Sequence, residues 1–396
     1  MNSGILKFTA DYLHDGTALL RDHVLITDAG GKVVEIVPTG DAGGDVQSFD
    51  GLLCPGFINA HCHLELSHLW KKIPEHTGLV NFLIAVMRER DATAPEEILQ
   101  AARRAQQAME ENGIVAVGDV SNKTDSLPVK QQGNLFYHTF VEAIGFSDTG
   151  AGKRMVQALK VREDFRHQGL AASIVPHAPY SVSASLFRLI NQQGAEAIIS
   201  IHNQETTAED ELYLGDTSDF YRLYENLHLP YDSFRSTGKS SLQSWLPYFD
   251  QGQSLVLVHN TFTGEEDLLF AVKSNHPLYW CLCPKANDYI ENRMPPVERL
   301  LRHHVKIVLG TDSLASNHQL SILEEMKTLQ RHFHRLSLET MLRWATLNGA
   351  EALGCSATFG SFENGKRPGI VNLCPLSKAS RRSIALVAGT RAHRIK

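Results

Sequence analysis

The sequence predicts an α/β fold, a (β/α)8 barrel of the TIM type, with strand-rich segments at both chain ends. Three observations predict it, two in the central part of the chain and one at the chain ends. Eight short apolar runs alternate with longer amphipathic or connecting segments between residues 52 and 333. Each run ends in polar residues. Strands that alternate with helices indicate a parallel sheet with helices outside, and eight repeats indicate closure into a barrel.

The two ends of the chain have a different residue pattern from the central part. Short extended runs such as HVLITD (23–28) and KVVEIVP (32–38) are separated by Asp-Gly, Gly-Gly and Thr-Gly turn signals, which predicts a small antiparallel sheet. After Gly369, IVNLCPL (370–376) and SIALVAG (383–389) are strand-like again and could rejoin that sheet. We therefore expect three segments: residues 1–54 and 365–396 in a small domain, and residues 55–364 in the barrel.

The barrel strands follow one another at regular intervals. Helices are expected at 95–113, 184–194 and 320–333, and Gly113 suits the end of the first of them. Residues 212–249 are longer than an ordinary connection and predict an insertion beside the barrel mouth, of unassigned role. The eight predicted strands lie within residues 52–65, 114–121, 135–146, 170–181, 197–206, 254–262, 278–287 and 305–313.

Composition excludes several classes of protein. The 396 residues carry 38 basic and 44 acidic side chains, a net charge of -6, without a basic patch for nucleic acid or anionic membranes. No window approaches the ~20 apolar residues of a membrane helix, and no secretory signal is recognisable. Six scattered cysteines favour a reducing compartment. We expect a cytoplasmic protein with a small-molecule substrate and no nucleic-acid or membrane partner.

The 19 histidines are the most informative feature of the composition, because histidine is the commonest metal ligand. His61 and His63 lie two apart at the end of the first predicted barrel strand. Side chains alternate across a strand, so both imidazoles face the same side and can reach one ion. An isolated His-x-His is a weak signal, and a half-buried pair without metal is the competing interpretation.

Three further strands end in a residue able to bind metal. His202, His259 and Asp312 each follow a mostly apolar run, where an uncompensated polar side chain inside the barrel is costly. Each could be a satisfied rim residue, but agreement of four strand ends predicts one shared metal site. Imidazoles with a carboxylate suit one Zn²⁺ per chain with an open position for water, although Fe²⁺, cobalt or manganese are also compatible.

Two more residues follow strand ends. Glu205 comes three residues after His202, where a carboxylate can approach both the metal water and the substrate, and it is the candidate general acid/base. The acids Glu209 and Asp210 are instead typical of a first helical turn. His177, in VPHAPYS, points at the barrel mouth and could bind substrate or hydrogen-bond to the loop backbone.

The motifs PGFINAHCHLE, VPHAPYSVS, IHNQET, LVHNTF and LGTDSLASN resemble, in order, those of the amidohydrolase superfamily, in its cytosine-deaminase-like and chlorohydrolase-like branch. The likeness is nearest to adenosine-type deaminases acting on 5′-substituted adenosines such as S-adenosylhomocysteine, methylthioadenosine or aminodeoxyfutalosine. Two departures stand out: Asn372 replaces a familiar aspartate in the small domain, and Asn203-Gln204 follow His202 where small or apolar residues are usual.

This resemblance implies a role for each residue. His61, His63, His202 and Asp312 would hold one divalent metal, and Asp312 would also take part in proton transfer. His259 would orient the attacked group, Glu205 would shuttle protons, and His177 would contact substrate. The implied fold pairs the barrel with a small β-sandwich from both chain ends, and a homodimer is compatible with it. The implied reaction is hydrolytic deamination of an aminated N-heterocycle, a purine or pyrimidine, by a metal-activated water.

Alternatives remain open on the sequence. Glu65 and Glu75 could reach a ribose hydroxyl or lie at a cap or surface, and Asn287 could line the mouth or shape its loop. Hydrolysis of a cyclic amide usually needs a modified lysine bridging two metals, and the third and fourth strands end without lysine. Chloro- or alkylamino-triazine hydrolysis would use the same site. A non-catalytic binding protein would be expected to lack a ligand or Glu205.

Overall fold

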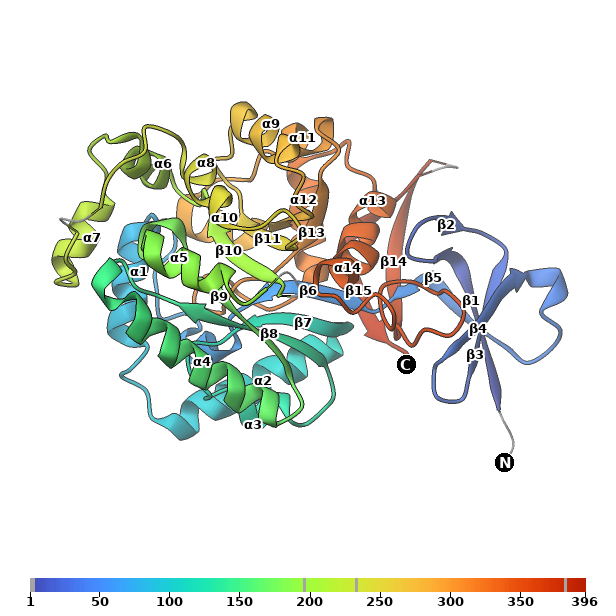
Figure 1. The fold of residues 1–396 in the computed structure, drawn as a ribbon. Helices are drawn as coiled ribbons and strands as arrows, with labels where there is room; N and C mark the ends of the chain where they lie inside the picture. The colour runs from blue at the N-terminus through green and yellow to red at the C-terminus, as the bar shows by residue number, and fades with distance from the viewer. Residues whose placement is uncertain (1–3, 195–196, 232–233, 381–382) are drawn as a thin grey trace.

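The computed structural model describes residues 4–194, 197–231, 234–380 and 383–396, and it consists of a large α/β unit beside a smaller sheet (Figure 1). Each of the eight runs predicted as barrel strands contains a strand. One set is β6 (Phe57–Cys62), β7 (Ile114–Val120), β8 (Phe136–Ala143) and β9 (Ala171–Pro176). The other is β10 (Ile199–Asn203), β11 (Leu255–His259), β12 (Leu278–Leu282) and β13 (Lys306–Leu309). Each set forms a parallel sheet in chain order.

Backbone hydrogen bonds join the two parallel sheets at both seams. The N–H of His202 on β10 donates to the carbonyl of His177, just after β9, at 3.0 Å. The N–H groups of Thr311 and Asp312, just after β13, donate to the carbonyl of His61 on β6 at 3.0 and 3.1 Å. Each seam therefore lies among the residues predicted to carry the chemistry.

Helices cover the outside of the parallel sheets (Figure 1). The predicted helices at 95–113, 184–194 and 320–333 are present as α2, α5 and α12. The α-helices of the described residues are α1 (Leu79–Glu89), α2 (Pro95–Glu111), α3 (Leu127–Lys130), α4 (Ala151–His167), α5 (Ala184–Asn191), α6 (Thr207–Leu214), α7 (Phe220–Asn226), α8 (Ser241–Trp245), α9 (Glu265–Lys273), α10 (Pro284–Glu291), α11 (Val297–Arg302), α12 (Ile322–His332), α13 (Leu338–Arg343) and α14 (Gly349–Ala352). None of the helices in the described ranges has the length and apolar character needed to cross a bilayer.

Helix α2 illustrates why these segments are helical. Pro95 occupies its first position and Glu96 its first turn, both favourable at a helix N-terminus. Ala105 and Met109, four residues apart, face the core, and the helix ends before Gly113, which adopts a φ of 82°.

The predicted insertion, residues 212–249, contains the end of α6 together with α7 and α8; residues 232–233 lie outside the described part of the chain.

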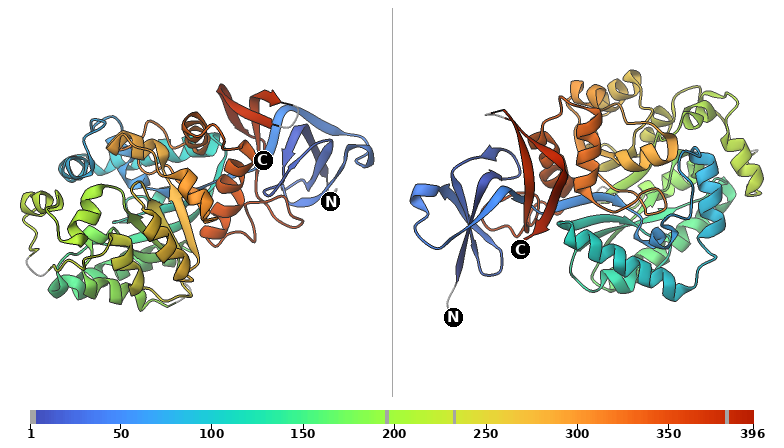
Figure 2. Two further views of the ribbon diagram at one scale, coloured as in Figure 1. Left: turned by 90° about the horizontal axis from the view of Figure 1, so that it is seen from above. Right: turned by 180° about the vertical axis from the view of Figure 1, so that it is seen from behind.

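Both chain ends contribute to one mixed sheet at one end of the molecule, as the two views of Figure 2 show. Its strands are β1 (Ile5–His14), β2 (Leu19–Leu20), β3 (His23–Asp28), β4 (Val33–Pro38), β5 (Val46–Pro55), β14 (Ile370–Ser380) and β15 (Ser383–Arg394). The expected return of the C-terminal segment is confirmed, because β14 pairs with β5. A purely antiparallel N-terminal sheet was wrong: after the β3–β4 hairpin the chain crosses to the other side of β1, so β5 pairs with β1 in parallel.

The predicted run 52–65 is divided between the two parts of the molecule. β5 ends at Pro55 and β6 begins at Phe57, with Gly56 between them. Gly56 donates its N–H to Pro368 at 3.0 Å, and a side-chain Cβ there would lie 2.3 Å from Val115. The chain therefore passes from the mixed sheet into the parallel sheet at a position that has room only for glycine. The proposed domain boundaries stay predictions.

Candidate active site and metal centre

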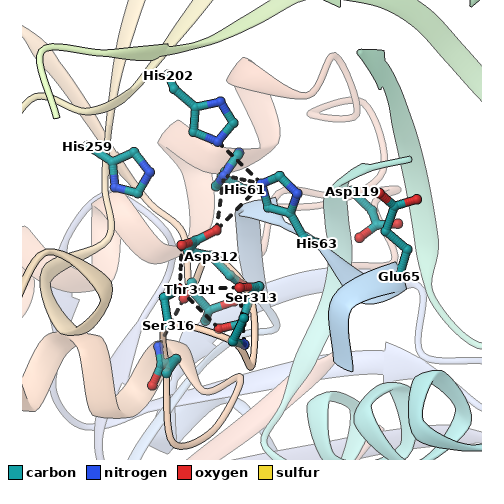
Figure 3. A network of polar contacts seen from close by, with 12 residues as sticks. His61, His63, Glu65, Asp119, His202, His259, Thr311, Asp312, Ser313 and Ser316 are labelled. Atoms are coloured by element: carbon teal, nitrogen blue, oxygen red, sulfur yellow. Dashed lines mark hydrogen bonds and ion pairs between the residues drawn. The ribbon is translucent and has the colours of Figure 1, made fainter. Parts of the chain in front are cut away.

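Four side chains converge where β6, β10 and β13 end (Figure 3). His61 lies on β6, His63 directly follows it, His202 lies on β10, and Asp312 follows β13. The Nε2 atom of His63 lies 3.1 Å from that of His61 and 3.3 Å from that of His202. The Oδ1 atom of Asp312 lies 3.6 Å from Nε2 of His61 and 3.5 Å from Nε2 of His63. All four predicted metal ligands are thus brought together.

The spacing of these donor atoms fits a metal ion. Zn–N bonds of about 2.0–2.1 Å in a tetrahedral site place neighbouring ligand atoms about 3.3–3.4 Å apart. The Nδ1 atom of His202 lies 2.7 Å from the carbonyl oxygen of His177, which can only accept a hydrogen bond. Nδ1 therefore carries the proton, and Nε2 presents a lone pair to the centre of the cluster. Nitrogen and carboxylate oxygen donors in this arrangement suit zinc.

The electrostatics of the cluster favour the ligand forms of these side chains. Burial lowers the pKa of His61, His63 and His202, which keeps the imidazoles neutral, the form that binds metal. Burial alone would raise the pKa of Asp312, but His61, His63 and His259 outweigh it and hold that pKa well below its usual range. Asp312 is therefore a carboxylate, and Ser316 donates a hydrogen bond to its Oδ2 at 2.5 Å.

His259 and Glu205 lie beside the four ligands. The imidazole of His259 stacks on that of His202, with ring centroids 5.4 Å apart. Its Nε2 lies 3.5 Å from Oε1 of Glu205, and its Nδ1 lies 2.8 Å from Oδ1 of Asn287. Burial, with Asp312 and Glu291, raises the pKa of Glu205 well above its usual range. A buried carboxyl group of raised pKa thus lies beside the four side chains of the cluster.

The backbone is strained where the site residues leave their strands. Gln204, His259, Asn260 and Asp312 have φ values of 45°, 71°, 57° and 56°, although none is glycine. Conformations of this kind cost on the order of 1–3 kcal/mol each and persist where surrounding contacts hold them. They turn each strand sharply into the loop that presents its side chain.

A cavity of about 540 Å³ opens above the cluster. His63, His202, Glu205, His259 and Asp312 form part of its wall. Most of the remaining wall is apolar and comes from α1, α7 and the loops near them. These residues are Leu66, Leu79, Phe82, Leu83, Val86, Met87, Ile144, Phe146, Tyr180, Leu223, Tyr224, Leu227, Leu229 and Pro230. The site is accessible to a ligand with substantial apolar surface.

Two predicted substrate contacts, His177 and Glu65, also line this cavity. The Nδ1 of His177 lies 2.7 Å from the Ser181 hydroxyl, and burial lowers the pKa of His177 to about 4, so the ring is neutral. Glu65 accepts hydrogen bonds from the backbone N–H and the side-chain amide of Asn122, each at 2.9 Å. Both side chains are therefore held in place beside the cavity.

The other two predicted contacts lie elsewhere. Asn287 is not part of the cavity wall; it lies behind His259, accepting from Nδ1 and donating to the His259 carbonyl at 3.3 Å. Glu75 is on the surface, where it lies 3.0 Å from His318 with a side chain 45% exposed. Asn287 thus orients a site histidine, while Glu75 has no contact with the cavity.

Among the cavity residues that the sequence interpretation missed are Glu142, at the end of β8, and Asn122, after β7. The Oε1 of Glu142 lies 3.6 Å from Nδ1 of His202, and its Oε2 accepts from the Asn122 amide at 3.1 Å. Burial raises the pKa of Glu142 to about 8. A signal for both residues was available in the sequence, because both are polar residues at or just after the end of a predicted strand. The same rule identified His202.

Comparison with known proteins identifies the family of this chain. Residues 52–386 match the amidohydrolase family. The 5-methylthioadenosine/S-adenosylhomocysteine deaminase of Saccharophagus degradans is 28% identical over 378 residues, covering 89% of this chain and 78% of that protein. The adenosine deaminase of Helicobacter pylori is 26% identical, covering 88% of this chain and 86% of that protein.

A solved structure shows the same fold. The Helicobacter pylori aminofutalosine deaminase in complex with methylthio-coformycin has a TM-score of 0.80 and 23% identity, covering 95% of this chain and 93% of that one. This likeness implies a TIM-barrel fold for the parallel sheets. Because the family match spans most of the chain, the protein is a member of the amidohydrolase family, as the motifs indicated, and a hydrolytic enzyme acting on carbon–nitrogen bonds.

Proposed function

We propose that this enzyme hydrolytically deaminates an adenosine-type nucleoside, using a water molecule activated by a single zinc ion. One observation carries the proposal: three imidazole nitrogens and one carboxylate oxygen converge at the floor of an apolar cavity, beside a buried glutamic acid. The deaminase names of the relatives support the same reaction. We also propose that the two parallel sheets close into one barrel, which the hydrogen bonds at both seams support.

His61, His63, His202 and Asp312 would hold the metal ion. Bound there, zinc supplies a water of lowered pKa and stabilises developing negative charge. The raised pKa of Glu205 suits it to give a proton to a ring nitrogen of the heterocycle. His259, fixed by Asn287, is placed to hydrogen-bond to the attacked group.

The reaction balances with water as the only co-reactant. The water oxygen bonds to the amine-bearing carbon, and the carbon–nitrogen bond then breaks. Asp312 and Glu205, which line the same cavity, would carry protons from the water to the departing nitrogen. The products are the oxo-heterocycle and ammonia.

The cavity supports a nucleoside that carries an apolar 5′ substituent. The apolar side chains of α1 and α7 line the same cavity as the proposed ligands and would contact the part of the substrate remote from the reacting carbon. Glu65, held by Asn122, is placed to accept hydrogen bonds from ribose hydroxyls, and neutral His177 can contact the heterocycle. 5′-Methylthioadenosine and related nucleosides are accordingly the first substrates to test.

The test is ammonia release by zinc-loaded enzyme from a panel of 5′-substituted adenosines, other aminated purines, pyrimidines and pterins. Turnover of an adenosine-type compound is expected, and Glu205→Gln should lower it by roughly 10²–10⁴-fold. Glu211→Gln, on α6 and outside the cavity wall, is the matched control. Folded enzyme with one zinc per chain and no turnover on the panel would reject the proposal. Cyclic amides and chlorotriazines would then be tried.

A further inference from the structure

The insertion reaches the two residues that separate a proposed metal ligand from the proposed proton shuttle. Asn203 and Gln204 lie between His202 and Glu205. On α8, within the insertion, the indole Nε1 of Trp245 donates to Oδ1 of Asn203 at 2.9 Å. The other side of Asn203 contacts Asn260, the residue after His259, at 3.1 Å. The strand end is therefore held from both sides.

Gln204 is held even more extensively. Its backbone N–H donates to Oε1 of Glu209 at 2.9 Å. Its side-chain amide donates to Oδ2 of Asp267 at 2.8 Å and to Oδ2 of Asp210 at 3.1 Å. The carbonyl of Gln204 accepts from Phe262 at 2.9 Å. Gln204 is fully buried with a φ of 45°, so this strained backbone is fixed by four separate contacts.

Two serines of the insertion complete the network. The hydroxyl of Ser241 donates to Oε1 of Glu209 at 2.5 Å, and its N–H donates to Asp210 at 2.8 Å. The hydroxyl of Ser240 donates to Oδ1 of Asp267 at 2.5 Å. Three closely spaced acidic side chains need these donors, because buried carboxyl groups without partners are costly. We call this group the clamp: Gln204, Glu209, Asp210, Ser240, Ser241 and Asp267.

We propose that the insertion serves catalysis by positioning Glu205, and that Gln204 is the positioning residue through which the clamp acts. Gln204 is adjacent to Glu205 in the chain, so the conformation of its backbone sets the direction in which the Glu205 side chain leaves the strand. The role of Glu205 in this inference rests on the proposed function. No residue of the clamp is itself part of the cavity wall or one of the four proposed ligands.

The experiment compares Gln204→Met, which keeps the size of the side chain and removes its donors, with the wild type. Displacement of Glu205 should lower kcat by roughly 10- to 100-fold while KM stays within about twofold and zinc content is unchanged. The double variant Gln204→Glu with Asp267→Asn reverses donor and acceptor and should recover part of kcat. An unchanged kcat in Gln204→Met would overturn the inference. So would a fall in kcat that is accompanied by a raised KM and a lowered zinc content and is not recovered in the double variant.

The insertion is tested with a matched pair of serines on α8. Ser241→Ala removes a clamp donor and should lower kcat, whereas Ser244→Ala, whose hydroxyl donates to the Ser240 carbonyl, should not.

A measurement that does not depend on turnover separates this inference from the proposed function. The infrared carboxyl band that disappears in Glu205→Gln should shift in Gln204→Met and Ser241→Ala. If the wild type deaminates nothing but the band shifts, only the proposed function fails. If the band stays unchanged in both variants, the clamp does not position Glu205.

Discussion

At the residue scale, Glu325 couples the stability of the molecule to pH. It is fully buried on α12, where it accepts hydrogen bonds from the Lys285 N–H and the Asn317 amide, each at 2.9 Å. Burial raises its pKa to about 8. The group keeps its proton in the folded state while the unfolded chain loses it above about pH 4.5. Its contribution to stability is therefore complete below pH 4.5 and is lost as the pH rises to about 8.

Replacing Glu325 with glutamine should reduce this dependence, because an amide cannot ionise. We expect the free energy of unfolding to fall less between pH 5 and pH 8 in Glu325→Gln than in the wild type. Urea titrations at both pH values measure the difference. The neighbouring Glu324, which is bonded to Lys327 at 2.7 Å, provides the control Glu324→Gln. Equal pH dependence in wild type and Glu325→Gln would contradict the expectation.

Gly310 packs against His61, one of the proposed metal ligands. A Cβ at this position would lie 2.9 Å from Cβ of His61 and from Sγ of Cys281. Gly310→Ala should displace His61, weaken zinc binding and cost about 1–3 kcal/mol of stability through overpacking. Zinc affinity and thermal unfolding check this, with Gly152→Ala as control, because a Cβ at Gly152 meets no atom within 4 Å. An unaltered zinc affinity in Gly310→Ala would contradict the expected displacement of His61 and would show that β13 shifts in its place.

The residues that could be predicted from sequence are those whose position follows a local rule. Alternation along β6 placed His61 and His63 on one side, and the strand-end rule placed His202 and Asp312. The need for glycine at position 310 depends on contacts with His61 and Cys281 on other strands, which the neighbouring sequence does not reveal. Glu75 was near in sequence to the site, but the loop after β6 carries it to the surface.

At the element scale, an ion pair between β7 and α3 fixes the segment that follows β6. Asp119 and Lys130 are fully buried, 2.6 Å apart. The other oxygen of Asp119 accepts from the backbone N–H of Leu64, the residue after His63, at 2.8 Å. The Lys130 ammonium also lies 4.7 Å from the centre of the Phe165 ring. Through Asp119, this pair connects the segment that follows His63 to helix α3.

Breaking only one side of this pair leaves a buried charge. Lys130→Met should therefore cost about 3–5 kcal/mol of unfolding free energy, and the double variant with Asp119→Asn should be less damaging than the single change. A double-mutant cycle by denaturant unfolding measures the coupling. The exposed pair of Lys123 and Asp91, 3.0 Å apart, is the control and should show a coupling below about 1 kcal/mol. Additive effects at Asp119 and Lys130 would count against the pairing.

Elements with strong local signals were predicted, and their partners were not. The proline at the start of α2 and the glycine after it set that helix almost to the residue. The boundary expected after residue 54 falls inside the run 52–65, where Pro55-Gly56 is a turn signal, but the pattern does not indicate which sheet each half joins. The parallel pairing of β1 with β5 depends on how the chain returns after a hairpin, a choice made by packing.

At the scale of the whole molecule, the proposed metal would join the two parallel sheets. His61 lies on β6 of the first sheet, and His63 directly follows that strand. His202 lies on β10 of the second sheet, and Asp312 follows its strand β13. Zinc that binds only the folded state should stabilise it by roughly 2.7 kcal/mol at one hundred times its dissociation constant. We expect Tm to rise with zinc and fall with a chelator. His202→Ala should abolish the rise, while His318→Ala, at the surface, should retain it. A Tm insensitive to zinc would argue against this site.

The overall architecture follows from the alternation of eight strands with helices, which few folds accommodate. The two sheets meet through backbone hydrogen bonds such as that from His202 to His177. The face that the insertion covers depends on the contacts of Trp245 with Asn203 and of Gln204 with the acids around it. The order of elements is therefore contained in the sequence pattern, and their junctions are not.

The placement of the chain ends has a practical consequence. Near the C-terminus, the Lys396 ammonium donates to the carbonyl of Ala29 at 3.4 Å. Near the N-terminus, a Cβ at Gly4 would lie 4.0 Å from the side chain of Ala29 as well. Both ends thus leave from the mixed sheet, while α1 and α7, which border the cavity, lie at the opposite end of the molecule (Figure 1). A support or fusion partner attached at either terminus would leave the cavity entrance facing the solution.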